Sequence, residues 1–323
     1  MQGMKTMNAV SFAGGLPVVL ERPRPRPGPG WARIRVHLAG ICKTDLEIMK
    51  GYHGFQGILG HEFLGVVDSC ADPAWIGRRV AGEINAACGR CQWCAQGMGR
   101  HCPRRTTLGI AGLDGCMAEY CCLPMENLYQ VDRDIPDERA ILTEPLAAAC
   151  AILEQIALQG NERILVLGDG RLGILCAWVL ATVTPEVTLA GHHQGKLNIA
   201  RWREIRTVLG TADLTPGADV VVDATGSRSG FEQALALCRP RGVLVLKSTL
   251  AERTELNLAP LVINEITVVG SRCGRFADAL SLMRNCPDMP LERLLTRRYP
   301  LSRAPEAFAA AREPGSLKVV LEC

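Results

Sequence analysis

The pattern of apolar and polar positions divides the chain into two parts with different periods. Apolar and polar residues alternate over residues 31–39, as in a half-buried strand, and short strands, glycines and turns continue over residues 36–131. This first part is predicted to be mostly β. A helix is predicted to begin at Glu144-Pro145 and to run to about residue 158, because proline is favoured at the first helical position.

The second part alternates apolar runs with helical stretches, which is typical of a parallel sheet covered by helices. Its predicted strands lie at residues 163–167, 187–190, 220–223, 242–246 and 266–269. The span between residues 206 and 218 is short for a full crossover helix. The chain as a whole is therefore predicted to be an α/β protein, and its 323 residues suit about two domains.

Composition excludes several classes of function. A net charge of +3 with 21% charged and 5% aromatic residues argues against a nucleic-acid partner. The longest uncharged segment near the start, residues 6–20, is broken by Gly14, Gly15 and Pro17, so neither a signal peptide nor a membrane span is predicted. Fifteen cysteines without an export signal predict a cytoplasmic location, where thiols stay reduced and can bind metals.

Four closely spaced cysteines are the strongest chemical signal in the sequence. Two-residue spacers separate Cys88, Cys91 and Cys94, and Cys102 follows after seven more residues. Such spacing lets tight turns point the thiolates at one centre, and four thiolates fill the tetrahedral shell of a structural Zn²⁺. Disulfides are the alternative, but they are typical of small secreted domains.

A second metal site is predicted from residues that lie further apart. A catalytic zinc takes three protein ligands and keeps one exchangeable position. Cys42 and His61 are candidate ligands, and Glu62 and Glu144 are candidate carboxylates. The alternative is that a lone cysteine and a lone histidine are ordinary buried core residues.

A glycine-rich loop follows the apolar run at residues 163–167 and opens a helical stretch at residues 174–181. In this context a GxGxxG loop predicts a dinucleotide site, because its glycines let the backbone approach the pyrophosphate at the helix N-terminus. The candidate cofactor-binding residues of the loop are Gly168, Gly170, Arg171, Leu172 and Gly173, with Asp169 between the first two glycines.

The acidic residue that usually binds the adenosine ribose is missing after the second strand of this part. Gly191, His192 and His193 stand there instead, and Lys196 follows. A small residue leaves room for a 2′-phosphate and the basic residues offer it charge, so NADP is favoured over NAD. The alternative is that these are exposed loop residues and that NAD binds without the usual acid.

The carboxyl ends of the three later strands carry further candidates, because ligands bind outside these ends in parallel sheets. They are Thr225, Ser248, Thr249, Gly270 and Ser271.

Taken together, these elements resemble the zinc-dependent medium-chain alcohol dehydrogenases. The Cys-x-Thr-Asp element at Cys42, the Gly-His-Glu-x-x-Gly element at Gly60 and the cysteine lobe at residues 88–102 stand in the order and at the spacings of that family. The resemblance covers nearly the whole chain. It implies a GroES-like, mostly β catalytic domain at residues 1–146 and 276–323, and a Rossmann domain with a doubly wound parallel sheet at residues 147–275.

The resemblance also implies roles for the residues around Cys42. Cys42 and His61 would bind the catalytic zinc, Thr44 would pass on the proton of the substrate, and Asp45 would support the site from behind. N-capping of the helix is the alternative role for Thr44 and Asp45. Many relatives carry a histidine at the position of Glu47, so the outer end of the proton relay is open.

Glu144 is followed by proline and leucine, as in relatives that act on polyols, sugars or threonine, and would be the third zinc ligand. Glu62 would then exchange with zinc-bound water. Lys318, in the closing strand, would reach the cofactor pyrophosphate, and a solvated surface lysine is the alternative.

The predicted activity is hydride transfer between an alcohol and NAD(P), with two zinc ions per chain, in a homo-oligomer (a dimer or a tetramer). Tyr52, His53 and Ile84 are candidate pocket residues, and His53 is also a candidate relay residue. The identity of the alcohol and the physiological direction stay open. Two rivals are a reductase of the same fold without catalytic zinc and a zinc-binding cofactor sensor without turnover.

Overall fold

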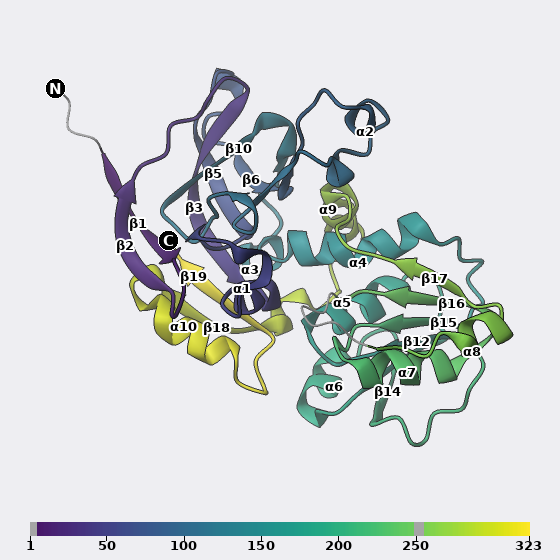
Figure 1. Cartoon of the computed structure of the whole chain (residues 1–323). Helices are drawn as coiled ribbons and strands as arrows, with labels where there is room; N and C mark the ends of the chain where they lie inside the picture. The colour runs from purple at the N-terminus through teal and green to yellow at the C-terminus, as the bar shows by residue number, and fades with distance from the viewer. Residues whose placement is uncertain (1–4, 249–254) are drawn as a thin grey trace. The chain divides into compact units, whose positions relative to one another are not determined.

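The computed structural model describes residues 5–248 and 255–323 (Figure 1). Thr249 therefore lies outside the described residues. The chain forms two compact units. Unit 1 contains Met1–Glu144, Leu280–Arg284 and Leu295–Cys323, and unit 2 contains Pro145–Ala279 and Asn285–Leu294.

Unit 1 is built mainly from antiparallel strands. They are β1 (Thr6–Phe12), β2 (Val18–Pro23), β3 (Trp31–Ile41), β4 (Gly57–Ile58), β5 (Glu62–Ser69), β6 (Arg79–Gly82), β7 (Asn85–Ala86), β8 (Thr106–Leu108), β9 (Gly112–Leu113), β10 (Tyr120–Pro124), β11 (Leu128–Gln130), β18 (Leu295–Pro300) and β19 (Lys318–Glu322). The largest sheet has the order β11-β6-β5-β3-β19-β18, and β10 also pairs with β3. Two smaller sheets have the orders β2-β1-β4 and β7-β8-β9.

Strand β3 brings three distant segments of unit 1 together. Its last residues pair with the start of β5, where Gly40 lies opposite Glu62. On its other side β3 pairs with β19, where Ile41 lies opposite Val319. In Figure 1 the yellow β19 accordingly lies against the purple β3. The end of β3, the start of β5 and the start of β19 are therefore neighbours.

Unit 2 contains one parallel sheet with the strands β12 (Ile164–Leu167), β13 (Val187–Gly191), β14 (Arg206–Leu209), β15 (Ala218–Asp223), β16 (Cys238–Leu246) and β17 (Thr267–Gly270). Its order is β14-β13-β12-β15-β16-β17. The five predicted strands are all present, so the Rossmann prediction is confirmed. Strand β14 was not predicted because only one of its four residues is buried. As expected, residues 210–217 between β14 and β15 form no helix.

The helices of the described chain are α1 (Lys43–Ile48), α2 (Gln92–Ala95), α3 (Asp137–Ala140), α4 (Thr143–Gln155), α5 (Arg171–Leu180), α6 (Gln194–Ala200), α7 (Arg228–Leu237), α8 (Ala259–Ile263), α9 (Phe276–Asn285) and α10 (Ala304–Ala311). The 3₁₀ helices are η1 (Tyr52–Gly54), η2 (Pro73–Trp75), η3 (Gly99–His101), η4 (Met125–Asn127), η5 (Leu291–Leu294) and η6 (Leu301–Arg303). None of the helices in the described chain is long and apolar enough to cross a membrane.

Helix α5 forms the buried centre of unit 2. Its residues 173–180 are all buried, which agrees with an apolar sequence on every face. The Trp178 indole nitrogen, which is fully buried, donates to the Ala200 carbonyl over 2.8 Å. This bond satisfies the polar atom of the largest buried side chain and joins α5 to the end of α6.

The chain returns from unit 2 to unit 1 in two steps, whereas the sequence predicted one step at residue 276. Residues 285–294 belong to unit 2 even though they follow a segment of unit 1. The Trp202 indole nitrogen donates to Asp288 over 2.9 Å, and the Arg203 guanidinium lies 3.5 Å from the Cys286 sulfur. These contacts hold the later segment on unit 2.

Candidate metal centres and dinucleotide loop

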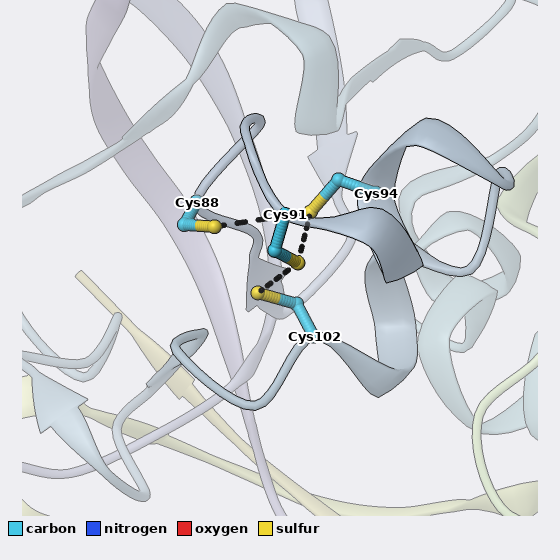
Figure 2. A group of neighbouring side chains, drawn as sticks. All are labelled: Cys88, Cys91, Cys94 and Cys102. Carbon is cyan, nitrogen blue, oxygen red and sulfur yellow. Dashed lines mark hydrogen bonds between the residues drawn. The ribbon is translucent and has the colours of Figure 1, made fainter.

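The four cysteines of the lobe point their sulfur atoms at one centre, as Figure 2 shows. The sulfur atom of Cys91 lies 3.4 Å from that of Cys94 and 3.7 Å from that of Cys102, and the sulfur atoms of Cys88 and Cys94 are 4.0 Å apart. Sulfur atoms around a tetrahedral zinc, each at about 2.3 Å, are about 3.8 Å from one another. The quartet therefore has the size of a closed zinc shell.

Backbone contacts change the pKa of individual thiols in the quartet. Cys91 is the N-cap residue of α2. The backbone amide of Arg90 donates to the Cys88 sulfur and is the main cause that lowers the pKa of Cys88 to about 6. A thiol with a lowered pKa is more readily the thiolate that a metal needs, whereas burial and the neighbouring Cys91 thiol raise the pKa of Cys94 to about 11. All fifteen cysteines lie in the described part of the chain and all are free, so the disulfide alternative is wrong for this structure.

Replacing Cys91 with serine should remove one zinc ion per chain and lower Tm by at least about 2 °C, because a loss of about 1 kcal/mol of stability corresponds to roughly 2–4 °C for a domain of this size. Metal analysis and thermal unfolding check both effects. Cys70→Ser is the matched control, since the Cys70 thiol is half-buried and donates to the Asp72 carbonyl outside the quartet. Unchanged zinc content in Cys91→Ser would contradict the assignment.

The second cluster contains Cys42, His61 and Glu62, whose ligand atoms all lie within 4.8 Å of one another. Cys42 is the N-cap residue of α1, His61 comes just before β5, and Glu62 is the first residue of β5. His61 is only 3% exposed and Glu62 is fully buried. Sulfur, nitrogen and carboxylate donors in one small group are the donor set of an open, catalytic zinc site.

Asp45 fills both roles that the sequence left open. One carboxylate oxygen accepts from the Cys42 backbone amide over 2.7 Å and so caps α1. The other lies 3.4 Å from the His61 Nδ1 atom, and neither of these two buried atoms has a hydrogen-bond partner among the described residues. A metal on the other ring nitrogen would leave a proton on Nδ1 facing Asp45, so the residues fit a zinc ion.

The charge around His61 favours a positive partner. Burial lowers the pKa of His61, but the Asp45 carboxylate and the Cys42 thiol raise it more, so the net shift is upward. The same negative surroundings stabilise a bound cation.

Replacing Asp45 with asparagine should weaken zinc binding at this site by about 10–100-fold, as loss of a carboxylate behind a metal-bound histidine usually does. Asparagine keeps an oxygen that can cap α1, so the fold should be retained. Competition with a chelator of known affinity measures the change, and the quartet zinc serves as an internal control. An unchanged affinity would show that Asp45 only caps the helix.

The other residues predicted around this cluster differ in their contacts. The Thr44 hydroxyl lies 3.8 Å from the Cys42 sulfur, close enough to contact a ligand at the cluster. Glu47 forms an ion pair with Lys50 over 2.9 Å. His53 has a φ of 58° and its ring packs on Tyr52 at a centroid distance of 4.2 Å, while Ile84 is buried. The outer end of the proton relay stays open between Glu47 and His53.

Glu144 and Lys318 occupy different positions relative to the three-residue cluster. Glu144 is the second residue of α4 and half-buried, and it is not part of the three-residue cluster, so its role as a ligand stays a prediction. Lys318 is fully buried and forms an ion pair with Glu62. The surface-lysine alternative is therefore wrong. The Lys318 amine faces the metal cluster, and its predicted contact with the pyrophosphate gains no support from this position.

The glycine loop has the context that the sequence predicted, between β12 and α5. Gly168 has a φ of 110°, and a Cβ there would lie 2.8 Å from the Ala224 carbonyl oxygen. A Cβ at Gly173 would collide with the Gly168 carbonyl. A Cβ at Gly170 would meet nothing within 4 Å, which leaves the backbone open at the N-cap of α5, where a pyrophosphate is expected.

The ends of the later strands are held by polar contacts. The Thr225 hydroxyl and amide both donate to Asp223, over 2.7 and 2.9 Å. Ser248 is half-buried after β16, and Gly270 ends β17. These positions agree with their place at the carboxyl edge of the sheet, and their contact with a cofactor stays a prediction.

The sequence did not predict a role for Lys247, which lies at the carboxyl edge of the same sheet. Its buried amine donates to the Ser271 hydroxyl over 3.0 Å and to the carbonyls of Ala148 and Arg272 over 2.5 and 3.2 Å. It therefore joins the residues after β17 to α4. A single lysine at the end of an apolar strand gave no signal for this role.

One of the residues after β13 forms a contact that the sequence did not predict. His192 and His193 are exposed and Lys196 is half-buried. The His193 backbone amide and ring both contact Asp169, the residue between the first two loop glycines. Sequence reasoning gave Asp169 no role, although a carboxylate in the loop of a chain that lacks one after the second strand was the available signal.

Comparison with known proteins agrees with the fold. The alcohol dehydrogenase GroES-like domain matches residues 28–133, and the zinc-binding dehydrogenase domain matches residues 200–285. A sorbitol dehydrogenase of Halalkalibacterium halodurans is 28% identical over 98% of this chain and 99% of its own length. An L-threonine 3-dehydrogenase of a Chelativorans species is 30% identical over 90% of each chain.

Among solved structures, a zinc-binding dehydrogenase of Sinorhizobium meliloti with bound NADP has a TM-score of 0.89 and 25% identity, over 99% of this chain and all of the other. The likeness to these proteins therefore extends through both units. The chain belongs to the zinc-type medium-chain alcohol dehydrogenases and falls in their polyol- and threonine-dehydrogenase-like group.

Proposed function

We propose that the chain oxidises an alcohol of the polyol, sugar or amino-alcohol class, or reduces the corresponding carbonyl compound, with NADP favoured over NAD. The observation that carries this proposal is the cluster of Cys42, His61 and Glu62 with Asp45 behind it. The relatives named sorbitol dehydrogenase and threonine dehydrogenase support the class of substrate.

Different residues of unit 1 would bind the metal, transfer the proton and orient the His61 ring. A zinc ion held by Cys42 and His61, with Glu144 as the predicted third ligand, would polarise the substrate oxygen as a Lewis acid and lower its pKa. The Thr44 hydroxyl, 3.8 Å from the Cys42 sulfur, would take up the proton that leaves this oxygen and release its own proton to the outer end of the relay, at Glu47 or His53. Asp45 holds the His61 ring in one orientation.

Unit 2 supplies the dinucleotide. The open backbone at Gly170 would hold the pyrophosphate, to which the amides at the N-terminus of α5 can donate. NADP is favoured because His192, His193 and Lys196 surround the end of β13. The NADP bound to the Sinorhizobium meliloti protein supports the use of a nicotinamide dinucleotide.

A homo-oligomer is part of the proposal. Strand β17 is one of the two edge strands of its sheet within the described residues, and the adjacent α8 leaves Val262 and Ile263 78% and 77% exposed. An unpaired edge beside exposed apolar side chains favours association with a second copy. The cytoplasmic location stays a prediction from the number of cysteines.

The test of the proposed function offers the zinc-loaded protein a panel of polyols, sugars, amino alcohols and simple alcohols, each with NADP and with NAD. Nicotinamide absorbance reports turnover. We expect turnover with at least one polyol, sugar or amino alcohol and a higher kcat/KM for NADP. A protein that binds dinucleotide and zinc but turns over no alcohol or carbonyl compound would be the cofactor sensor.

A further inference from the structure

A buried carboxylate lies at the place where the sequence lacks one. Asp169 comes from the glycine loop after β12, and β12 pairs in parallel with β13, so that Leu167 lies opposite Ala190. This pairing puts the Asp169 carboxylate over the backbone of Gly191, the last residue of β13. A side chain at position 191 would collide with the carboxylate, and only glycine leaves room for it.

This carboxylate is only 7% exposed and is engaged with one partner. Asp169 Oδ2 accepts from the His193 backbone amide over 2.6 Å. Both carboxylate oxygens lie 3.1 Å from the His193 Nδ1 atom. Because the carboxylate accepts at that nitrogen, Nδ1 carries a proton, and Nε2 is the ring atom that can contact a ligand.

The His193 ring is the exposed member of the pair. Its side chain is 46% exposed, and the backbone bond from the same residue to Asp169 fixes the place from which it extends. The end of the second strand is where the adenosine ribose binds in this type of sheet. The arrangement is similar to that of a metal-bound histidine, in which a carboxylate at one ring nitrogen fixes the orientation of the ring and leaves the other nitrogen for the ligand. Here Asp169 lies at Nδ1, and Nε2 is left.

We propose that His193, oriented by Asp169, recognises the 2′ position of the adenosine ribose and sets the preference for NADP. Nε2 would share a hydrogen bond with a 2′-phosphate, and the charge of the phosphate makes this bond stronger than the single neutral hydrogen bond that a 2′-hydroxyl offers. Asp169 is a positioning residue that acts through His193. This inference rests on the proposed function, because it requires that unit 2 binds a nicotinamide dinucleotide.

The test measures NADPH and NADH binding by nicotinamide fluorescence, with the full zinc-loaded chain and no alcohol present. His193→Ala should weaken NADPH binding by about tenfold and NADH binding by less than about twofold, the loss expected for one charge-assisted hydrogen bond. His192→Ala is the matched control, because the neighbouring imidazole does not contact Asp169, and it should change the NADPH/NADH ratio less than His193→Ala does.

Asp169→Ala should lower the same ratio, and the double variant Asp169→Ala/His193→Ala should be no worse than His193→Ala alone. Additive losses, equal effects of the two histidines, or an unchanged ratio in His193→Ala would overturn the proposal. An NADPH affinity that rises in Asp169→Ala would also overturn it, since the carboxylate would then repel the phosphate. If the wild-type protein binds neither dinucleotide, the proposed function fails as well, whereas equal binding of both with unresponsive variants removes this inference alone.

Discussion

Replacing Cys42 with serine is expected to reduce kcat by about a thousandfold or more. The zinc supplies several kcal/mol of charge stabilisation, and about 4 kcal/mol corresponds to a factor of roughly a thousand in rate. Serine is a poor ligand for zinc, so the variant should also lose one zinc ion per chain. The structure makes Cys42 the sulfur donor of its cluster, next to the buried His61 and Glu62.

Two controls separate loss of the metal from loss of the fold. Cys70→Ser changes a half-buried thiol elsewhere in unit 1 and should keep full activity and zinc content. The Cys42→Ser variant should still bind NADPH, because the glycine loop belongs to unit 2. Full activity of Cys42→Ser would contradict the assignment of the catalytic site.

Replacing Lys318 with methionine is expected to destabilise unit 1 by about 3–5 kcal/mol, the usual cost of removing one member of a buried ion pair. Both members of the Lys318–Glu62 pair are fully buried. The pair lies against Gly40, where a Cβ would be 3.2 Å from the Lys318 nitrogen. A larger residue at position 40 would therefore crowd the ion pair. Urea unfolding measures the change.

The double variant Glu62→Gln/Lys318→Met distinguishes charge from packing. It removes the buried negative charge as well as the positive one, so we expect it to recover more than half of the stability lost in Lys318→Met. A double variant as unstable as Lys318→Met alone would mean that packing of the lysine stem, and not the ion pair, stabilises this region.

Local patterns carried most of the fold. The parallel sheet of unit 2 follows from apolar runs separated by helices, and each predicted strand is present within a few residues. The cysteine quartet is local too, since its spacers and turns place the sulfur atoms within 4.0 Å of their neighbours. The helix at Glu144 begins at Thr143, next to the predicted position, and ends at Gln155.

Contacts between distant segments could not be predicted in the same way. Lys318 and Glu62 are 256 residues apart and meet only because β5 and β19 pair with the two sides of β3. The contact between Asp169 and His193 likewise depends on the pairing of β12 with β13. The sequence shows only a charged residue in an otherwise apolar strand, as for Lys318, or in a glycine loop, as for Asp169. Neither pattern identifies the partner residue.

Of the two candidate zinc sites, the one at Cys42 and His61 is expected to be catalytic. The most direct measurement is alcohol turnover by protein stripped of both metals and then reloaded with zinc in steps, with zinc content determined at each step. We expect no turnover in the metal-free protein and a return of activity that follows occupancy of the Cys42 site, with no return in Cys42→Ser. Full turnover by the metal-free protein, or by Cys42→Ser, would contradict the account.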